Sequence, residues 1–311
     1  MNESPILTQM ETKPQELCGI LLIDKPEGFT SFDVVAKVRG IARTRKVGHG
    51  GTLDPMATGV LPLFLGSATK ACDILPDQTK AYEATFRLGE TTDTQDRTGT
   101  VLTTSEVSCT RADVEKALEQ FRGDILQLPP MYSAIWVQGR RLYDLAREGI
   151  EVEREPRPVT VHELNILEAD EATHTYKIYV SCSKGTYVRT ICHDVGQALG
   201  CGAVMTALRR VISSGYRAED AITIEQAQKL MDEGTLAEKV LPTETAFALY
   251  PRLRLNSKNA RLFRNGVRLS SEKAGCAGMQ GDFCIYGPHE TFLGLGYEEE
   301  GELRMRKLFV R

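Results

Sequence analysis

The sequence contains eight cysteines but no pair of them at C-x-x-C spacing. Scattered single cysteines provide neither the ligand spacing of a structural zinc site nor the framework of a disulfide-rich domain. We therefore expect reduced, mostly buried thiols and no metal site. The neighbours Cys192 and His193 could suggest a nucleophile with its base. Adjacent residues rarely face each other on a helix, however, so a hydrolase is disfavoured.

Long apolar runs are also absent. No stretch reaches the roughly 18 consecutive apolar residues of a membrane-spanning helix, and residues 1–15 have neither the basic start nor the apolar core of a secretion signal. We expect a cytoplasmic protein with no membrane partner and with a flexible N-terminus over residues 1–16. The chain also lacks a dinucleotide-binding glycine motif and any repeat of about 20–50 residues, which disfavours a solenoid.

Positive charge is not in excess, because the net charge is −4. This value argues against a protein that binds nucleic acid by bulk attraction, since phosphate contacts rely on Lys and Arg. The basic residues nevertheless gather in two segments without acidic side chains, namely Lys37, Arg39, Arg43, Arg45 and Lys46, and Arg252, Arg254, Lys258, Arg261, Arg264 and Arg268. Either segment could be an ordinary solvated face, but two of them flanking one candidate site favour a polyanionic partner.

The candidate site is residues 48–59, GHGGTLDPMATG, which contain one histidine and one carboxylate among four glycines. Glycine lets the backbone adopt positive φ and approach a ligand closely, while Pro55 keeps the preceding residue out of the helical region. We therefore expect Asp54 in an extended conformation on a stiff turn. An Asp-Pro pair between glycines is by itself usually only a turn.

Hydrophobic periodicity predicts strands over residues 19–24, 80–88, 159–167 and 175–182, and helices that start at Thr30 or Ser31, at Thr110 and at Tyr187. The first helix carries Phe32, Val35 and Val38 and leads into the first basic segment. Clustered strands with a few helices, rather than strict βαβα alternation, indicate an α+β fold with a mixed or antiparallel sheet. From Leu249 onward, frequent glycines and short strands predict a separate small β-rich domain.

Five segments, in order, resemble the TruB family of pseudouridine synthases, which modify the T-loop of transfer RNA. They are residues 19–26 (GILLIDKP), 48–59, 89–99 (GETTDTQDRTG), 129–141 (PPMYSAIWVQGRR) and 183–190 (SKGTYVRT). The resemblance implies a pseudouridine-synthase catalytic domain with a large mixed sheet over residues 17–248, followed by a PUA-like RNA-binding domain over residues 249–311. It also implies isomerisation of tRNA uridine 55 by base flipping. No cofactor, metal or obligate protein partner is implied, and we expect a monomer.

The resemblance assigns the central chemistry to Asp54, which matches the family's catalytic aspartate. Whether this carboxylate attacks the base, attacks C1′ of the ribose or removes a sugar proton stays open. A working carboxylate must remain ionised when water is excluded, and a neighbouring guanidinium is the simplest way to achieve this. Arg189, in the segment 183–190, is the expected partner.

The remaining site residues are expected to hold the substrate. By resemblance, Tyr82 stacks on the extruded uracil, Tyr187 and Leu208 close the pocket, and His49 contacts nucleotides of the loop. The residue pattern alone favours Tyr82 and Leu208 as ordinary core residues, and it leaves open that His49 makes only a local hydrogen bond. Lys25 is expected to support the catalytic segment rather than to perform chemistry.

Two other functions remain open. The chain could be an RNA-binding or tRNA-folding protein without chemistry, although such a protein has no need of Asp54, Tyr82 and Arg189 together. It could also be a guide-RNA-dependent relative within a ribonucleoprotein, which the absence of a long Lys-rich tail disfavours.

Overall fold

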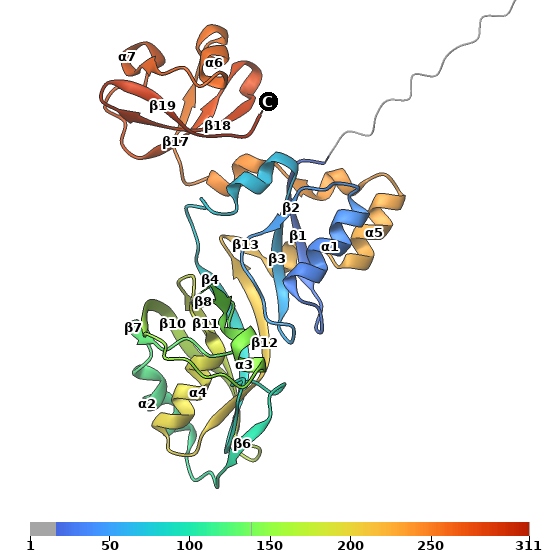
Figure 1. Ribbon diagram of the computed structural model, residues 1–311, viewed down its shortest axis with the longest axis vertical. Coiled ribbons are helices and arrows are strands. Elements are labelled where there is room, and N and C mark those ends of the chain that lie inside the picture. Colours follow the sequence, from blue (N-terminus) through green and yellow to red (C-terminus); the bar gives the residue numbers. More distant parts are fainter. Residues whose placement is uncertain (1–16, 138, 311) are drawn as a thin grey trace, which may run out of the picture.

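The computed structural model describes residues 17–137 and 139–310 (Figure 1). The flexible segment expected over residues 1–16 lies outside the described residues, as do Gln138 and Arg311. Within the described ranges, no helix combines the length and the apolar character needed to cross a membrane.

A ten-stranded sheet forms the larger part of the molecule, with the order β14-β1-β3-β12-β4-β11-β10-β7, β2 beside β3 and β13 beside β12. The strands are β1 (Gly19–Lys25), β2 (Val47–His49), β3 (Thr58–Leu65), β4 (Lys80–Leu88), β7 (Gly123–Gln127), β10 (Arg157–Asp170), β11 (Thr175–Cys182), β12 (Ala203–Ser213), β13 (Tyr216–Arg217) and β14 (Val240–Leu241). All pairs are antiparallel except β3 with β12, which is parallel. The predicted α+β fold with a large mixed sheet is confirmed.

Two pairs of helices cover this sheet. Helices α1 (Ser31–Ile41) and α5 (Ile224–Asp232) pack against β1 and β3, whereas α2 (Arg111–Glu119) and α4 (Val188–Ala198) pack against β4, β10, β11 and β12 (Figure 1). Helices α1 and α2 begin at the predicted residues, because Thr30 and Thr110 each form a capping box with an aspartate three residues later.

The buried face of α1 differs from the one that the sequence pattern indicates. Val34, Val35, Val38 and Ile41 are buried, as expected for helical spacing, but Phe32 is 66% exposed. Phe32 therefore lies outside the core, and the guanidinium of Arg39 lies over its ring at 5.8 Å from the ring centre.

Short elements complete the larger part. Strands β5 (Glu90–Thr92) and β6 (Val101–Thr104) form one hairpin, and β8 (Trp136–Val137) and β9 (Arg140–Arg141) form another, followed by α3 (Leu142–Arg147). The first hairpin encloses the segment 93–100, and the second follows a segment that reaches the candidate site through Tyr132.

The C-terminal part is β-rich, as the sequence predicts. Its five-stranded sheet has the order β15-β17-β18-β19-β16, and helices α6 (Ser257–Arg264) and α7 (Ser271–Ala274) accompany it. The strands are β15 (Arg252–Arg254), β16 (Leu269–Ser270), β17 (Asp282–Tyr286), β18 (Phe292–Glu299) and β19 (Glu302–Leu308). Phe247, Phe292 and Phe309 belong to one buried apolar cluster with Ile20 and Phe64 of the large sheet.

Candidate active site

Asp54 lies in the turn that connects β2 to β3, beside the parallel contact of β3 with β12. Its carbonyl accepts the backbone N–H of Ala57 at 3.0 Å. At the end of the turn, Gly59 has φ of 105°, and a Cβ atom there would lie 2.2 Å from the carbonyl oxygen of Arg210. Only glycine fits such a position, so the turn is pressed directly against the backbone of β12.

Helix α1 and the end of β1 hold the same turn from its other side. The Ser31 hydroxyl accepts the N–H of Leu53 at 2.8 Å and donates to its carbonyl at 3.3 Å. The fully buried Lys25 donates through Nζ to the carbonyl of Pro55 at 3.2 Å. Burial lowers the pKa of Lys25 to about 8. The structure thus places Lys25 in the supporting position that we expected.

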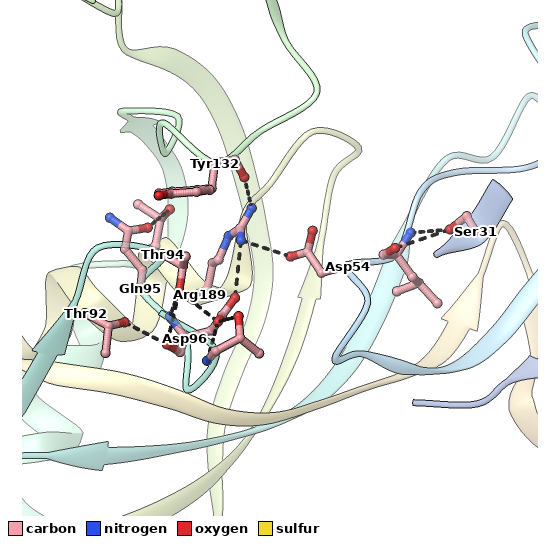
Figure 2. A network of polar contacts seen from close by, with 11 residues as sticks. Ser31, Asp54, Thr92, Thr94, Gln95, Asp96, Tyr132 and Arg189 are labelled. Carbon is pink, nitrogen blue, oxygen red and sulfur yellow. Dashed lines mark hydrogen bonds and ion pairs between the residues drawn. The ribbon is translucent and has the colours of Figure 1, made fainter. Parts of the chain in front are cut away.

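Arg189, the predicted partner of Asp54, is adjacent to it. Its Nη1 atom lies 3.5 Å from Oδ2 of Asp54 and 3.3 Å from Oδ2 of Asp96, and Nη2 donates to the carbonyl of Tyr132 (Figure 2). The Arg189 side chain is 6% exposed. One buried guanidinium therefore lies between two carboxylates, and a charge in this position stabilises both of them.

Asp96 is one of the residues that sequence reasoning missed. It is 2% exposed, and its Oδ1 accepts hydrogen bonds from Thr94 Oγ1 at 2.9 Å, Thr98 N at 2.9 Å and Thr98 Oγ1 at 2.5 Å. These donors leave Oδ2 to face Arg189 (Figure 2). The signal was present in the segment 89–99, because threonines two residues before and after an aspartate are suitable local donors.

The pKa of Asp54 is set by opposing effects, and Arg189 is one of those that favour the ionised carboxylate. Burial raises the pKa of Asp54, the charge of Arg189 lowers it, the charge of Asp96 raises it and that of Lys25 lowers it. The Asp54 side chain is still 31% exposed, so the carboxylate can reach a ligand from solvent. Asp54 is thus a semi-buried acid whose ionisation depends on Arg189.

The two tyrosines differ in their exposure. Tyr82 lies on β4 and is only 8% exposed, within the core cluster that also contains Leu53, Met56 and Leu208. Burial raises the pKa of Tyr82, and the nearby Arg210 opposes this rise.

Tyr187 precedes α4 and is partly exposed. The Arg189 guanidinium lies over its ring at 5.8 Å from the ring centre. Burial also raises the pKa of the Tyr187 hydroxyl, and the charge of Asp54 adds to the rise for both tyrosines.

Leu208 and His49 lie on different strands, β12 and β2. Leu208, on β12 opposite Ala84, is 8% exposed and packs in the same cluster as Tyr82. His49 ends β2, and its Nδ1 accepts the N–H of Gly51 at 3.3 Å. Burial lowers the pKa of His49, which favours the neutral form of the imidazole. His49 therefore makes a local hydrogen bond, which the residue pattern alone allowed, and its side chain remains half-exposed.

The rival pair Cys192 and His193 does not form a nucleophilic site. Cys192 is fully buried, and burial raises the pKa of its thiol to about 12, so no thiolate forms at neutral pH. All eight cysteines are free thiols, and five of them are buried. The described residues contain no cluster of three or more His, Cys, Asp or Glu side chains that could hold a metal ion.

The chain is similar to known proteins over most of its length. A family model described as TruB family pseudouridylate synthase (N terminal domain) matches residues 39–188, and one described as tRNA pseudouridylate synthase B C-terminal domain matches residues 189–248. A tRNA pseudouridine synthase B of Clostridium kluyveri is 40% identical over 293 residues, which cover 94% of this chain and 99% of that protein.

A Haemophilus influenzae protein of the same name is 40% identical over 302 residues, which cover 96% of this chain and 97% of the relative. Among solved structures, a chain from a Cbf5-Nop10-Gar1 complex aligns with a TM-score of 0.71 and 25% identity, covering 94% of this chain and 85% of that one.

Proposed function

We propose that this chain, which belongs to the TruB family of pseudouridine synthases, isomerises uridine 55 in the T-loop of tRNA to pseudouridine. The observation that carries the proposal is the half-exposed Asp54 carboxylate on a rigid turn, with the buried Arg189 at 3.5 Å. In this proposal the enzyme works in the cytoplasm as a monomer without an obligate protein partner. Residues 17–248 would form the catalytic domain and residues 249–311 a PUA-like RNA-binding domain.

The reaction breaks the bond between C1′ of the ribose and N1 of uracil, rotates the base and forms a bond from C1′ to C5. The hydrogen at C5 leaves as a proton and N1 gains one, so no atom is gained or lost overall. Asp54 could attack the base, attack C1′ or remove a sugar proton. Each of these roles requires an ionised carboxylate that faces the nucleotide, and Arg189 favours that ionisation.

Reaching a stacked uridine requires that it be extruded from the T-loop. In our proposal the extruded base lies against Tyr82, Tyr187 and Leu208 form the walls, and His49 contacts neighbouring nucleotides. Stacking on an aromatic ring is worth roughly 1–3 kcal/mol, which offsets much of the cost of extrusion. The packing of Tyr82 in one cluster with Leu53 and Leu208, and the position of the Arg189 guanidinium over the Tyr187 ring, support this assignment.

Replacing Tyr82 with Leu should reduce the single-turnover rate of pseudouridine formation by about 10- to 100-fold, while the Kd for tRNA rises by less than about threefold. The reason is that stacking acts only on the extruded base. Rapid-quench assays and filter binding measure the two quantities. Tyr179→Leu, on the other face of the neighbouring strand β11, is the control. Equal losses of rate and of binding would contradict a platform for the base.

The first basic segment is the proposed binding surface for the tRNA backbone. Lys37, Arg43, Arg45 and Lys46 are exposed, on α1 and in the segment that connects α1 to β2. In the second segment, Arg254 is paired with Glu290 at 2.9 Å and Arg268 with Glu302 at 3.5 Å. Among the described residues, no such ion pair is seen for the four cations of the first segment, which leaves their charge for phosphates.

Changing Lys37 and Arg43 together to Gln should weaken tRNA binding and lower the slope of log Kd against log salt by roughly one for each charge removed. The single-turnover rate at saturating tRNA should stay the same, because this proposal assigns neither side chain to the reacting nucleotide. Binding titrations at several salt concentrations test this. Lys229→Gln on α5 serves as the control. An unchanged salt slope would exclude these residues as phosphate contacts.

A guide-dependent enzyme is the second candidate, because the fold aligns with a chain of a Cbf5-Nop10-Gar1 complex. Incubating the purified chain alone with an unmodified tRNA transcript, followed by mapping of pseudouridine, separates the candidates. Pseudouridine at position 55 supports the stand-alone enzyme. Tight binding without modification supports a pure RNA-binding protein, and modification only after addition of a guide RNA supports the ribonucleoprotein.

A further inference from the structure

Two buried cations lie beneath the turn that carries Asp54. Arg210, on β12, is 1% exposed, and Lys80, the first residue of β4, is 8% exposed. Arg210 donates to the carbonyl of Gly51 from Nη2 at 3.2 Å, to that of Thr52 from Nη1 at 3.4 Å and to that of Val60 from Nε at 2.9 Å. Both ends of the turn are thus bound to a single guanidinium.

Lys80 binds the carbonyl of the residue that precedes the two turn residues held by Arg210. Its Nζ donates to the carbonyl of Gly50 at 3.2 Å and to the hydroxyls of Ser213 and Ser214 at 3.0 and 2.9 Å. Three consecutive carbonyls, those of residues 50–52, therefore point toward the two cations. Two of these residues are glycines, whose peptide planes would otherwise rotate freely.

Placing two positive charges here is costly for stability. A charge removed from water costs several kcal/mol unless its hydrogen bonds are well made, and apolar side chains of the same size are often as stable or more so. Consistent with this cost, burial lowers the pKa of Lys80 to about 8 and also lowers that of Arg210. A role beyond packing explains why both positions hold a cation.

We propose that Arg210 and Lys80 are positioning residues, which hold the carbonyls of residues 50–52 and thereby fix the direction of the Asp54 carboxylate. This inference rests on the proposed function and refines its site. Asp54 follows Thr52 by two residues, and within the described part of the chain its carboxylate has one ion-pair partner, the Arg189 guanidinium at 3.5 Å. The direction of the side chain therefore depends on the backbone, and a shift of about 1 Å in a reacting group can cost about 100-fold in rate.

The test compares two variants with two matched controls. Lys80→Met removes the ammonium at similar length, and Arg210→Lys cannot reach several carbonyls at once. The controls are Lys70→Met and Arg122→Lys. In the wild type, Lys70 donates to the carbonyl of Leu308 and Arg122 to that of Leu164, and neither side chain contacts the turn. We expect each test variant to lose about 10- to 100-fold in single-turnover rate, with the Kd for tRNA within about threefold of wild type and the controls within about twofold.

Hydrogen–deuterium exchange provides a readout that does not depend on activity. Peptides covering residues 48–58 should exchange faster in both test variants, while peptides from β17 and β18 keep the wild-type rate. If the wild-type protein formed no pseudouridine, the proposed function would be overturned. Hydrogen–deuterium exchange would still show whether Lys80 and Arg210 hold the turn in place. Unchanged exchange, an unchanged rate, or unfolding of both test variants while both controls fold would overturn the positioning role.

Discussion

Replacing Asp54 with Asn is expected to lower the single-turnover rate of pseudouridine formation by at least about 1,000-fold, while the Kd for tRNA changes by less than about threefold. Asn has the same shape as Asp but cannot ionise, so it fills the position and removes only the negative charge. Because Arg189 retains its contact with Asp96, the surrounding geometry should persist. Rapid-quench kinetics on a tRNA transcript and filter binding provide the two measurements.

The control is Asp232→Asn, since Asp232 is an aspartate of α5 that contacts Gln228 far from the turn. This variant should match wild type in both rate and affinity. An Asp54→Asn enzyme that still converted uridine at an appreciable rate would remove Asp54 from the chemistry. A variant that lost rate and tRNA binding in proportion would instead indicate that the carboxylate serves binding alone.

Replacing Arg189 with Met is expected to cost at least about 100-fold in rate near neutral pH and to move the pH–rate curve toward higher pH. The pKa of Asp54 is raised by burial and by Asp96, and Arg189 opposes both effects. Without the guanidinium, that pKa rises further. Since the proposed reaction needs the ionised carboxylate, the rate should increase with pH through a higher range than in wild type.

Single-turnover rates at saturating tRNA between about pH 5 and about pH 9 locate this rise. Arg189→Lys keeps the charge but loses the planar contact with both carboxylates and the carbonyl of Tyr132. Its curve should stay close to that of wild type even if its maximum rate is lower. Identical pH profiles for Arg189→Met and wild type would show that Arg189 does not control the ionisation of Asp54.

Several elements could be predicted from the sequence because their signals are local. The predicted strands over residues 80–88 and 175–182 coincide with β4 and β11. More and less buried side chains alternate along the whole of β11 and, in β4, from Tyr82 onward, whereas the first three residues of β4 are all buried. Strand β10 extends beyond its predicted ends, because its register shifts against β11 disturb the alternation. The exposure of Phe32 could not be read from an amphipathic pattern, because apolar character alone does not show that its ring stays outside the core, beside the guanidinium of Arg39.

The candidate site was predictable only in part. Motifs indicated Asp54 and Arg189, but nothing local indicates that residues 135 positions apart approach to 3.5 Å. Asp96, Lys80 and Arg210 escaped notice because charged residues are ordinarily exposed, and hydropathy gives no reason to place them inside. Their burial depends on carbonyl and hydroxyl partners that the completed sheet brings close.

Successive arginines of β12 point to opposite faces of the sheet, so correct pairing of β12 with β4 decides which of them reaches the turn. Arg209 extends to the surface and binds Asp24 through both nitrogens, at 3.0 and 2.9 Å, whereas Arg210 is directed inward. If β12 shifted by one residue along β4, Arg209 would point inward and Arg210 outward. The guanidinium of Arg210 would leave the turn, and Leu208 would move to the opposite, exposed face. A protein with β12 shifted by one residue against β4 could remain compact but would be inactive. Activity is therefore a more sensitive test of the correct pairing of these strands than compactness is.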